Sequence, residues 1–199
     1  MKNPNHPKKG STITVDPIRK VKDLKNILGS LEDKPRDQLL FTMGIQTGLR
    51  CGDLLKLKAG DIKDLRLNDS LQIIESKTGK KNTLVINKAI EKALAYYLFS
   101  AKPKDSDYLF RSRKGDNKPL TIQAVNALVK RHTKTLRGNF GAHSLRKTWG
   151  YHQRVHFGVG FEVICKRYNH TSPSVTMRYL GIEDSEVKNI CLHEIGVES

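Results

Sequence analysis

The spacing of apolar residues along the chain is mostly helical. After Asp16 and Pro17, a capping residue and a proline suited to a first helical turn, apolar side chains keep the spacing of one helix face up to Gly29. Residues 35–47 continue this pattern. The clearest periodicity lies in residues 121–135, where apolar positions line one face and basic positions the other. Further helices are predicted over residues 53–57, 89–100, 143–157, 159–168 and 172–179.

Two short runs rich in β-forming residues interrupt the helical pattern. Residues 71–75 and 83–86 are joined by a polar, basic loop, which predicts an antiparallel hairpin. Asp61 and Ile62 could begin a further strand. We therefore predict a fold that is mainly α with a small antiparallel β-sheet (α+β).

The pattern divides the chain into three parts. Residues 1–11 are polar and carry prolines and lysines, which predicts a flexible basic leader, and residues 12–181 suit one domain with a sizeable core. In the tail, residues 182–199, one apolar helical face would be formed by Val187, Ile190, Cys191 and Ile195. That face must be buried, either on its own domain or on a neighbouring subunit.

The charge balance narrows the choice of partner. The 199 residues include 36 Lys and Arg against 20 Asp and Glu, for a formal net charge of +16 and a pI near 9.8. Basic residues are spread along most of the chain, which suits a broad phosphate-contacting surface. Nucleic acid is the leading partner. An anionic membrane is the runner-up, but no apolar run approaches the ~20 residues of a membrane span.

The cysteines and histidines argue against a metal site. Cys51, Cys165 and Cys191 are odd in number and far apart, so we expect reduced thiols in a cytoplasmic protein. Of the seven histidines, His152 and His156 fall at a His-x-x-x-His spacing, but no Cys-x-x-Cys grouping accompanies them. We expect neither a metal nor another cofactor.

Two arginines, two histidines and a tyrosine could serve phosphodiester chemistry. His143 and Arg146 lie one helical turn apart and so project from the same face. His170 precedes Tyr179 by nine residues in a basic, polar setting, and Arg50 ends an apolar segment. Arginine binds phosphate bidentately and stays protonated, histidine moves protons near neutral pH, and a tyrosine can attack as a nucleophile. This set is what cleavage of a phosphodiester by a tyrosine would need.

These segments resemble the motifs of the tyrosine recombinase (phage integrase) family, in the family's order. The similarity covers Thr47-Gly48-Leu49-Arg50, His143-Ser144-Leu145-Arg146, and His170 followed by Tyr179, and spans residues 12–181. It implies the tyrosine recombinase catalytic-domain fold. It also implies a site-specific DNA recombinase, or integrase, that cleaves and rejoins strands through a 3′-phosphotyrosyl intermediate without a cofactor.

The resemblance assigns roles to individual residues. Arg50 and Arg146 would clamp the phosphate, and Tyr179 would attack it. His143 and His170 would donate to the phosphate or move protons.

A second set of residues would support the reaction or bind DNA. Ser76-Lys77-Thr78-Gly79 resembles the family's hairpin lysine segment, so Lys77 is expected to protonate the departing 5′-oxygen. Asp53 matches the usual acidic position after the first arginine. Lys80 and Lys81 are alternatives to Lys77 and otherwise DNA contacts. The basic cluster of Lys130, Arg131 and Lys134 would either contact phosphates or form a solvated face.

The chain departs from the family pattern in two ways. Tyr168-Asn169-His170 stands where the family usually has Leu-Gly-His, a minor change because asparagine tolerates a left-handed conformation. Most members also carry an N-terminal helical core-binding domain, for which we expect no room here. Short members such as the fimbrial-switch invertases also lack it, so we expect a compact enzyme or a catalytic fragment.

Other interpretations remain open at this point. Each motif taken alone is more often a solvated helix face or ordinary packing. The alternatives are a type IB topoisomerase-like nicking enzyme, a catalytically silent DNA-binding module and an RNA-binding structural protein, although the last usually has an aromatic-rich sheet. For the recombinase we expect double-stranded DNA as partner, a monomer in solution, an oligomer on DNA, accessory DNA-bending proteins and no membrane.

Overall fold

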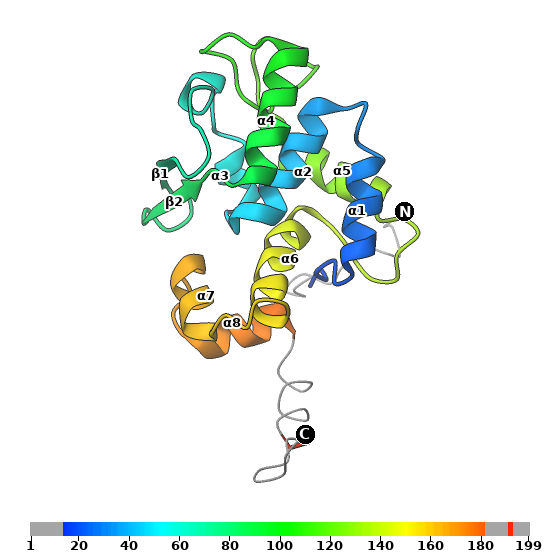
Figure 1. Cartoon of the computed structure of the whole chain (residues 1–199), viewed down its shortest axis with the longest axis vertical. Coiled ribbons are helices and arrows are strands. Elements are labelled where there is room, and N and C mark those ends of the chain that lie inside the picture. The colour runs from blue at the N-terminus through cyan, green and yellow to red at the C-terminus, as the bar shows by residue number, and fades with distance from the viewer. Residues whose placement is uncertain (1–13, 182–190, 193–199) are drawn as a thin grey trace, which may run out of the picture.

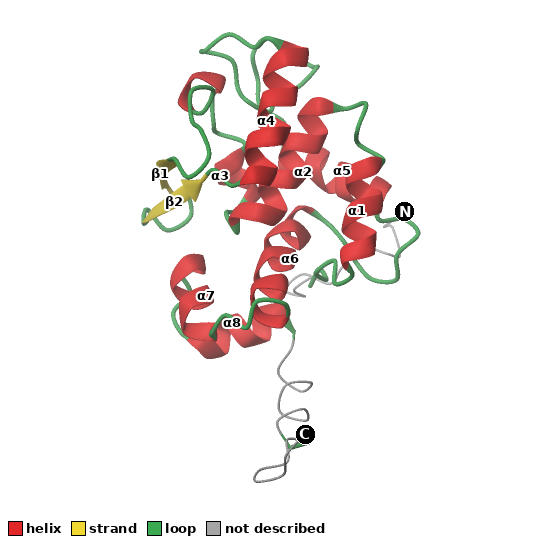
Figure 2. Ribbon diagram, viewed as in Figure 1, coloured by secondary structure: helices red, strands yellow, loops and turns green. Residues whose placement is uncertain are grey.

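The computed structural model describes residues 14–181 and 191–192, and Figures 1 and 2 show a mainly helical molecule with one hairpin. The expected fold class is confirmed. The residues of the predicted leader, and all of the predicted tail except Cys191 and Leu192, lie outside this range. The elements are α1 (Val21–Gly29), α2 (Pro35–Thr47), α3 (Cys51–Leu54), the 3-10 turn η1 (Ala59–Asp61), β1 (Ser70–Ile74), β2 (Lys81–Val85), α4 (Lys88–Ala101), α5 (Ile122–His132), α6 (Ala142–Val155), α7 (Phe161–Tyr168) and α8 (Pro173–Leu180).

The first helix begins later than its capping signal predicts. Asp16 does not cap it, and α1 starts at Val21 with Lys20 in the N-cap position. The carboxylate of Asp16 instead accepts a hydrogen bond of 2.8 Å from the Asn139 amide. The Ile18 amide donates to Thr148 Oγ1 on α6 at 2.8 Å. These two long-range hydrogen bonds hold the segment extended, so tertiary contacts override the local capping preference.

The prediction of a strand beginning at Asp61 and Ile62 is also wrong. A 3-10 turn forms there because the Asp61 side chain accepts a hydrogen bond from the Lys58 amide at 2.8 Å. The Ala59 amide donates to the Asp107 carbonyl at 2.9 Å, which anchors the turn to a distant loop. Ile62 then points into the core as a fully buried side chain.

Helix α2 is the centre of the larger hydrophobic cluster. Its residues from Leu39 to Ile45 are buried around the whole circumference, as expected of a helix surrounded by others. It packs against α4 and α6, and Figure 1 shows α4 running alongside it. This cluster includes apolar residues of α1, the hairpin, α4, α5 and the start of α6.

The hairpin attaches to this cluster through one face. β1 and β2 pair antiparallel with Leu71 opposite Leu84, and the loop between them closes with a hydrogen bond of 2.8 Å from the Gly79 amide to the Glu75 carbonyl. Gly79 has a φ of 65°, a left-handed conformation that glycine adopts without strain. Leu84 and Ile73 are buried, so the loop is fixed in direction relative to α2.

Helices α7 and α8 form a second, smaller cluster. Its buried members are Phe161, Ile164, Tyr168 and Leu180. Trp149 and Tyr151, on the last turns of α6, pack against it. In Figure 1, helices α7 and α8 lie below the hairpin and are connected to the larger body through α6. None of the helices in the described part of the chain is both long and apolar enough to cross a membrane.

Candidate active site

Arg50 stands where two helices meet. Helix α2 ends at Thr47, and its C-cap Gly48, with a φ of 65°, turns the chain. A Cβ at Gly48 would lie 2.6 Å from the ring of Trp149. Glycine is therefore required both for the conformation and for the close approach of Trp149. The turn places Arg50 at the N-cap of α3, with Nη1 2.5 Å from Glu75 Oε2.

Glu75 is the buried counter-charge of Arg50. Its side chain is fully buried and also accepts hydrogen bonds from Thr78 Oγ1 at 2.7 Å and Asn82 Nδ2 at 2.9 Å. Burial alone would raise the pKa of Glu75, but hydrogen bonds from Thr78, Asn82 and Arg50 outweigh it and lower the pKa to about 2. The carboxylate therefore stays ionised near neutral pH and orients Arg50.

Asp53 fixes the loop that carries Lys77. The Asp53 side chain is buried, and its Oδ1 accepts hydrogen bonds from the Ser76 amide at 2.9 Å and from Ser76 Oγ at 2.7 Å. The next residue, Lys77, is exposed. The expected acidic support thus comes from two carboxylates, with Glu75 paired to the arginine and Asp53 holding the lysine loop.

Helix α6 contributes His143 and Arg146. The Arg146 side chain is buried, its Nη2 donates to the Tyr168 carbonyl at 2.8 Å, and its Cζ lies 4.4 Å from the centroid of the Tyr168 ring. Its Nη1 is buried and has no hydrogen-bond partner among the described residues. A buried guanidinium nitrogen without an acceptor is costly unless a ligand supplies one, and a phosphate oxygen suits it.

His170 is held by the end of α7 and the start of α8. Asn169 ends α7 in the left-handed conformation with φ 54°. This was expected, because Asn169 stands where the family usually has glycine. The His170 amide then donates to the Cys165 carbonyl at 3.1 Å, and Nδ1 lies 3.0 Å from Thr176 Oγ1. Burial, followed by the charges of Arg146 and Arg50, lowers the pKa of His170 to about 4. The imidazole is therefore neutral at pH 7.

Tyr179 lies on α8 beside His170. The two ring centroids are 5.2 Å apart in a T-shaped arrangement, and the Tyr168 ring lies 5.5 Å from that of Tyr179. Burial raises the pKa of Tyr179, and the charges of Arg146 and Arg50 oppose the rise. The phenol is thus close enough to both guanidinium groups for them to favour its ionised form.

The remaining candidate, His143, shares the same electrostatic environment. It is exposed near the start of α6. Desolvation of the ring, followed by the positive charges led by Arg146 and Lys77, lowers its pKa. Lys77 also lowers the pKa of His170. The structure therefore brings all six expected catalytic residues into one positively charged site from five separate segments, the α3 start, the hairpin loop, α6, the α7–α8 turn and α8.

The basic residues expected to contact DNA lie in two places. Lys80 is exposed in the hairpin loop, and Lys81 is exposed at the start of β2, both near Lys77 in the chain. Lys130 and Arg131 are exposed in the last turn of α5, and Lys134 is exposed just after it. Figure 1 shows α5 on the other side of α2 from the hairpin. A role for either group in DNA contact stays a prediction.

Arg167 is one of three residues that sequence reasoning missed, together with Glu75 and Lys147. From α7, its Nε donates to the Thr47 carbonyl at 2.9 Å, and its Nη1 lies 2.5 Å from both Asn82 Oδ1 and the Thr83 carbonyl. Asn82 Nδ2 in turn donates to the Arg167 carbonyl at 3.1 Å. Arg167 thus joins α7 to the end of α2 and to β2. None of the three carries a sequence motif, since each depends on contacts between distant segments or on burial.

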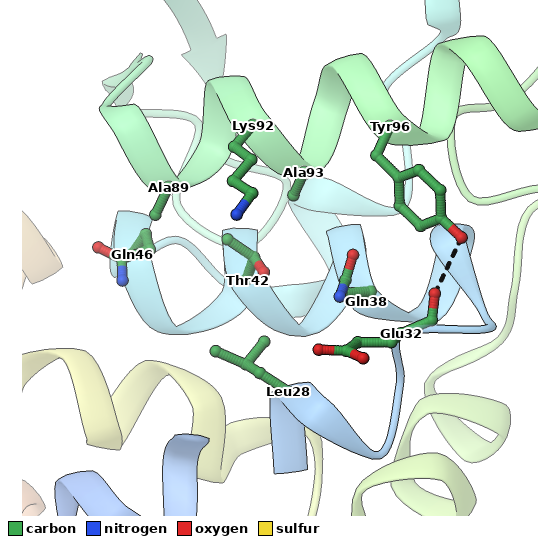
Figure 3. Close-up of a pocket in the computed structure, with 9 residues that line it drawn as sticks. All are labelled: Leu28, Glu32, Gln38, Thr42, Gln46, Ala89, Lys92, Ala93 and Tyr96. Carbon is green, nitrogen blue, oxygen red and sulfur yellow. Dashed lines mark hydrogen bonds between the residues drawn. The ribbon is translucent and has the colours of Figure 1, made fainter. Parts of the chain in front are cut away.

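A hollow of about 440 Å³ lies elsewhere, between α1, α2 and α4 (Figure 3). Tyr96 closes one end of it with a hydrogen bond of 2.9 Å from its hydroxyl to the Glu32 carbonyl. None of the candidate catalytic residues lines this hollow. Across the described residues, no group of three or more His, Cys, Asp or Glu is placed to hold a metal ion.

Comparison with known proteins identifies the family. A model of the phage integrase family matches residues 19–186. The probable integrase/recombinase YoeC of Bacillus subtilis (strain 168) is 35% identical over 178 residues, which cover 87% of this chain and 93% of YoeC. The tyrosine recombinase XerC of Caldanaerobacter subterraneus subsp. tengcongensis is 30% identical over 177 residues, 84% of this chain but 48% of XerC.

A solved structure agrees with these sequence matches. The crystal structure of XerA recombinase superposes with a TM-score of 0.70 at 22% identity, over 88% of this chain and 64% of XerA, which shows a common fold. The chain belongs to the phage integrase family, and its class is that of the tyrosine-type site-specific recombinases. It spans most of YoeC but only about half of the length of XerC.

Proposed function

We propose that this protein breaks and rejoins DNA strands at specific sites, with Tyr179 as the nucleophile. The observation that carries the proposal is the position of the Tyr179 phenol, half-buried beside His170 and within the field of Arg50 and Arg146. A surface tyrosine with a packing role has no need of two guanidinium groups beside it. Such groups do favour a phenolate and a phosphate in the same place.

The proposed reaction is an in-line displacement at phosphorus. The Tyr179 oxygen forms a bond to phosphorus while the bond from phosphorus to the 5′-oxygen breaks, which leaves a 3′-phosphotyrosyl link. Arg50 and the unpaired Nη1 of Arg146 would bind the non-bridging oxygens, where negative charge develops. Rejoining reverses these steps with a 5′-hydroxyl from another strand, so no external energy source is required.

Proton transfer is assigned to the lysine and histidines. Lys77 sits on a loop fixed by Asp53 and would give its proton to the departing 5′-oxygen. Because His170 has a lowered pKa and is neutral at pH 7, it can accept the phenol proton or donate a hydrogen bond to the phosphate. His143 is suited to the same two tasks.

Duplex DNA is the proposed substrate. Structures of the XerH recombinase bound to difH substrate share the fold, with a TM-score of 0.66 for the post-cleavage complex over 89% of this chain. The net charge of +16 fits a polyanionic partner of this kind. We further propose a monomer in solution that assembles into an oligomer on DNA, with accessory DNA-bending proteins. Action on cellular DNA and three unpaired cysteines favour a cytoplasmic location.

Trapping a covalent adduct tests the proposal. On a nicked suicide substrate, the short strand with the 5′-hydroxyl diffuses away, and the protein should remain linked to the 3′ end. Tyr179→Phe should abolish the adduct while leaving DNA affinity nearly unchanged, because it removes only the nucleophilic oxygen. Tyr96→Phe, in the hollow of Figure 3, is the matched control and should react normally.

Two results would contradict the proposed function. An adduct that persists in Tyr179→Phe would mean that another residue attacks. Relaxation of supercoiled plasmid without any strand exchange between two sites would favour the type IB topoisomerase-like alternative, which the family match does not support.

A further inference from the structure

Lys147 lies beneath the ring of Tyr179. It follows Arg146 on α6, its side chain is only 7% exposed, and its Nζ is 4.8 Å from the centroid of the Tyr179 ring. Among the described residues it has no ion pair with a carboxylate within 4.0 Å. The contact that the ammonium makes is with the face of the proposed nucleophile.

The segment before α1 explains how Lys147 becomes buried. The Ile18 amide donates to Thr148 Oγ1 at 2.8 Å, and His152 Nε2 lies 3.0 Å from the Ile18 carbonyl. These contacts lay residues 14–20 along α6. Asp16 comes near Lys147 in this way, but its carboxylate is already hydrogen-bonded to the Asn139 amide at 2.8 Å. Burial lowers the pKa of Lys147, and the charge of Asp16 opposes that shift.

Packing alone does not account for a charge at this position. An ammonium group loses hydration when it is buried, and an apolar side chain of similar length would fill the space without that cost. A cation over an aromatic face is attracted to the ring, and the attraction grows when the ring carries the negative charge of a phenolate. The contact between Lys147 and the Tyr179 ring is therefore stronger when Tyr179 is ionised than when it is neutral.

We propose that Lys147 is a positioning residue for strand cleavage, which holds the Tyr179 ring and favours the charge that its oxygen acquires during attack. The inference rests on the proposed function, since it requires Tyr179 to be the nucleophile. An interaction that strengthens toward the transition state speeds the chemical step and contributes little to DNA binding.

The first test compares three variants in adduct formation on the suicide substrate. Lys147→Met removes the charge and keeps the length, and it should slow cleavage by about tenfold, the scale of a desolvated cation–π contact. Lys147→Arg keeps the charge and should stay within about threefold of the unsubstituted protein. Lys166→Met, at an exposed position on α7, is the control and should change nothing. DNA affinity should be the same in all of them.

A second test separates an effect on Tyr179 from an effect on the phosphate. In the Tyr179→Phe protein, hydrogen peroxide can be supplied as an external nucleophile. Its oxygen bonds to phosphorus, the bond to the 5′-oxygen breaks, and that oxygen takes a proton. Adding Lys147→Met should leave this reaction within about twofold, because the contribution of Lys147 is made to the phenol oxygen that is no longer present. An equal loss in both reactions would overturn the inference.

A pH series provides an independent readout. The charged and titratable groups that face Lys147 are Asp16 from the segment before α1, Tyr179 from α8 and His143 on α6. The unsubstituted protein should cleave faster than Lys147→Met while the ammonium of Lys147 is protonated. This advantage should shrink as the pH rises and do so below the usual lysine pKa, because burial lowers the pKa of Lys147. Lys147→Arg should keep its advantage over the same range.

The outcomes distinguish this inference from the proposed function. If the unsubstituted protein forms no adduct, the proposed function fails. If it forms one and Lys147→Met reacts equally fast, only this inference fails. Should Lys147→Met not fold, Lys147→Gln supplies an uncharged polar variant, and loss of rate in both Gln and Arg variants would mean that shape alone matters.

Discussion

The two hydrophobic clusters of the molecule differ in size and in the chemistry they carry. The larger one, centred on α2, holds Arg50 at the end of that helix and Lys77 on the hairpin. The smaller one, α7 and α8, holds His170 and Tyr179. Helix α6 belongs to both, since Leu145 packs in the first and Trp149 against the second.

The proposed phosphate clamp and the proposed nucleophile are positioned by different means. In the larger cluster, many buried apolar side chains fix Arg50, as the close packing of protein interiors requires. The smaller cluster has four buried apolar or aromatic members and is also held to the rest of the protein by hydrogen bonds. Arg146 on α6 donates to the Tyr168 carbonyl on α7, and Arg167 on α7 donates to the Thr47 carbonyl at the end of α2.

Loss of either clamp arginine should have the largest effect. Arg50→Ala and Arg146→Ala should each slow adduct formation by at least ~10²-fold, the usual result of removing one preorganised donor to a developing oxyanion. Arg50→Ala should also lower the melting temperature, because Glu75 would remain buried without its counter-charge. Single-turnover cleavage and thermal unfolding measure the two effects. Adduct formation at the normal rate in either variant would remove that arginine from the proposed clamp.

Breaking the tie at Arg167 should have the next largest effect. Arg167→Met keeps Arg50, Arg146 and Tyr179 themselves unchanged but removes the contacts from α7 to Thr47 and Asn82. A shift of about 1 Å between nucleophile and phosphate can cost ~10²-fold in rate, so we expect a loss of up to that size with DNA affinity nearly unchanged.

Two controls make the Arg167 result specific. Arg167→Lys keeps the charge near the carboxyl end of α2, which favours cations, and should recover part of the rate. Lys166→Met, on the same helix, should be silent. If all three proteins cleave at the same rate, the smaller cluster is held without this tie.

Overpacking the smaller cluster should destabilise the protein more moderately. A Cβ at Gly150 would collide with the Tyr168 hydroxyl and lie 2.9 Å from Leu180 Cδ2. Gly150→Ala should therefore cost about 1–3 kcal/mol of unfolding free energy. Gly29→Ala in α1 is the matched change, with nothing within 4 Å of its added methyl group. Denaturant unfolding of both proteins checks the contrast, which equal midpoints would contradict.

Acidification should have the smallest effect on stability, and it should destabilise the two regions at different pH values. The pKa of His170 is lowered from 6.5 to about 4, so its contribution to stability is complete above pH 6.5 and is lost as the pH falls toward 4. The pKa of Glu75 is lowered from 4.5 to about 2, so its contribution is present above pH 4.5 and is lost toward 2. The α7–α8 region should therefore loosen first on acidification.

The imidazole signal of His170 in a pH titration by NMR tests this order, together with tyrosine near-UV dichroism and unfolding free energy. His170→Asn should reduce the pH dependence of the unfolding free energy between 6.5 and 4, to which His143 and His152 also contribute through their lowered pKa values, and should leave the part due to Glu75 below 4.5. A His170 signal that titrates at the ordinary value would show that its surroundings do not disfavour the charged form.

The elements whose signals are local could be predicted from the sequence. Helix α2 matches its predicted bounds, the hairpin appears where two β-rich runs flank Gly79, and Asn169 ends α7 in the left-handed conformation. The motifs around Arg50, Arg146 and Tyr179 could be found because each is short and contiguous. Helical periodicity and hydrogen bonds between near neighbours depend on residues only a few positions apart, so the sequence reveals them.

The way these segments support one another depends on contacts that form only in the folded protein. Asp16 lost its predicted capping role to a hydrogen bond with Asn139, 123 positions away in the chain. Glu75 became the counter-charge of Arg50, and Lys147 came to lie beneath Tyr179, because burial and contact depend on segments far apart in sequence. The free energy of a buried charge is set by the partners that the fold brings to it, and a linear sequence does not contain those distances.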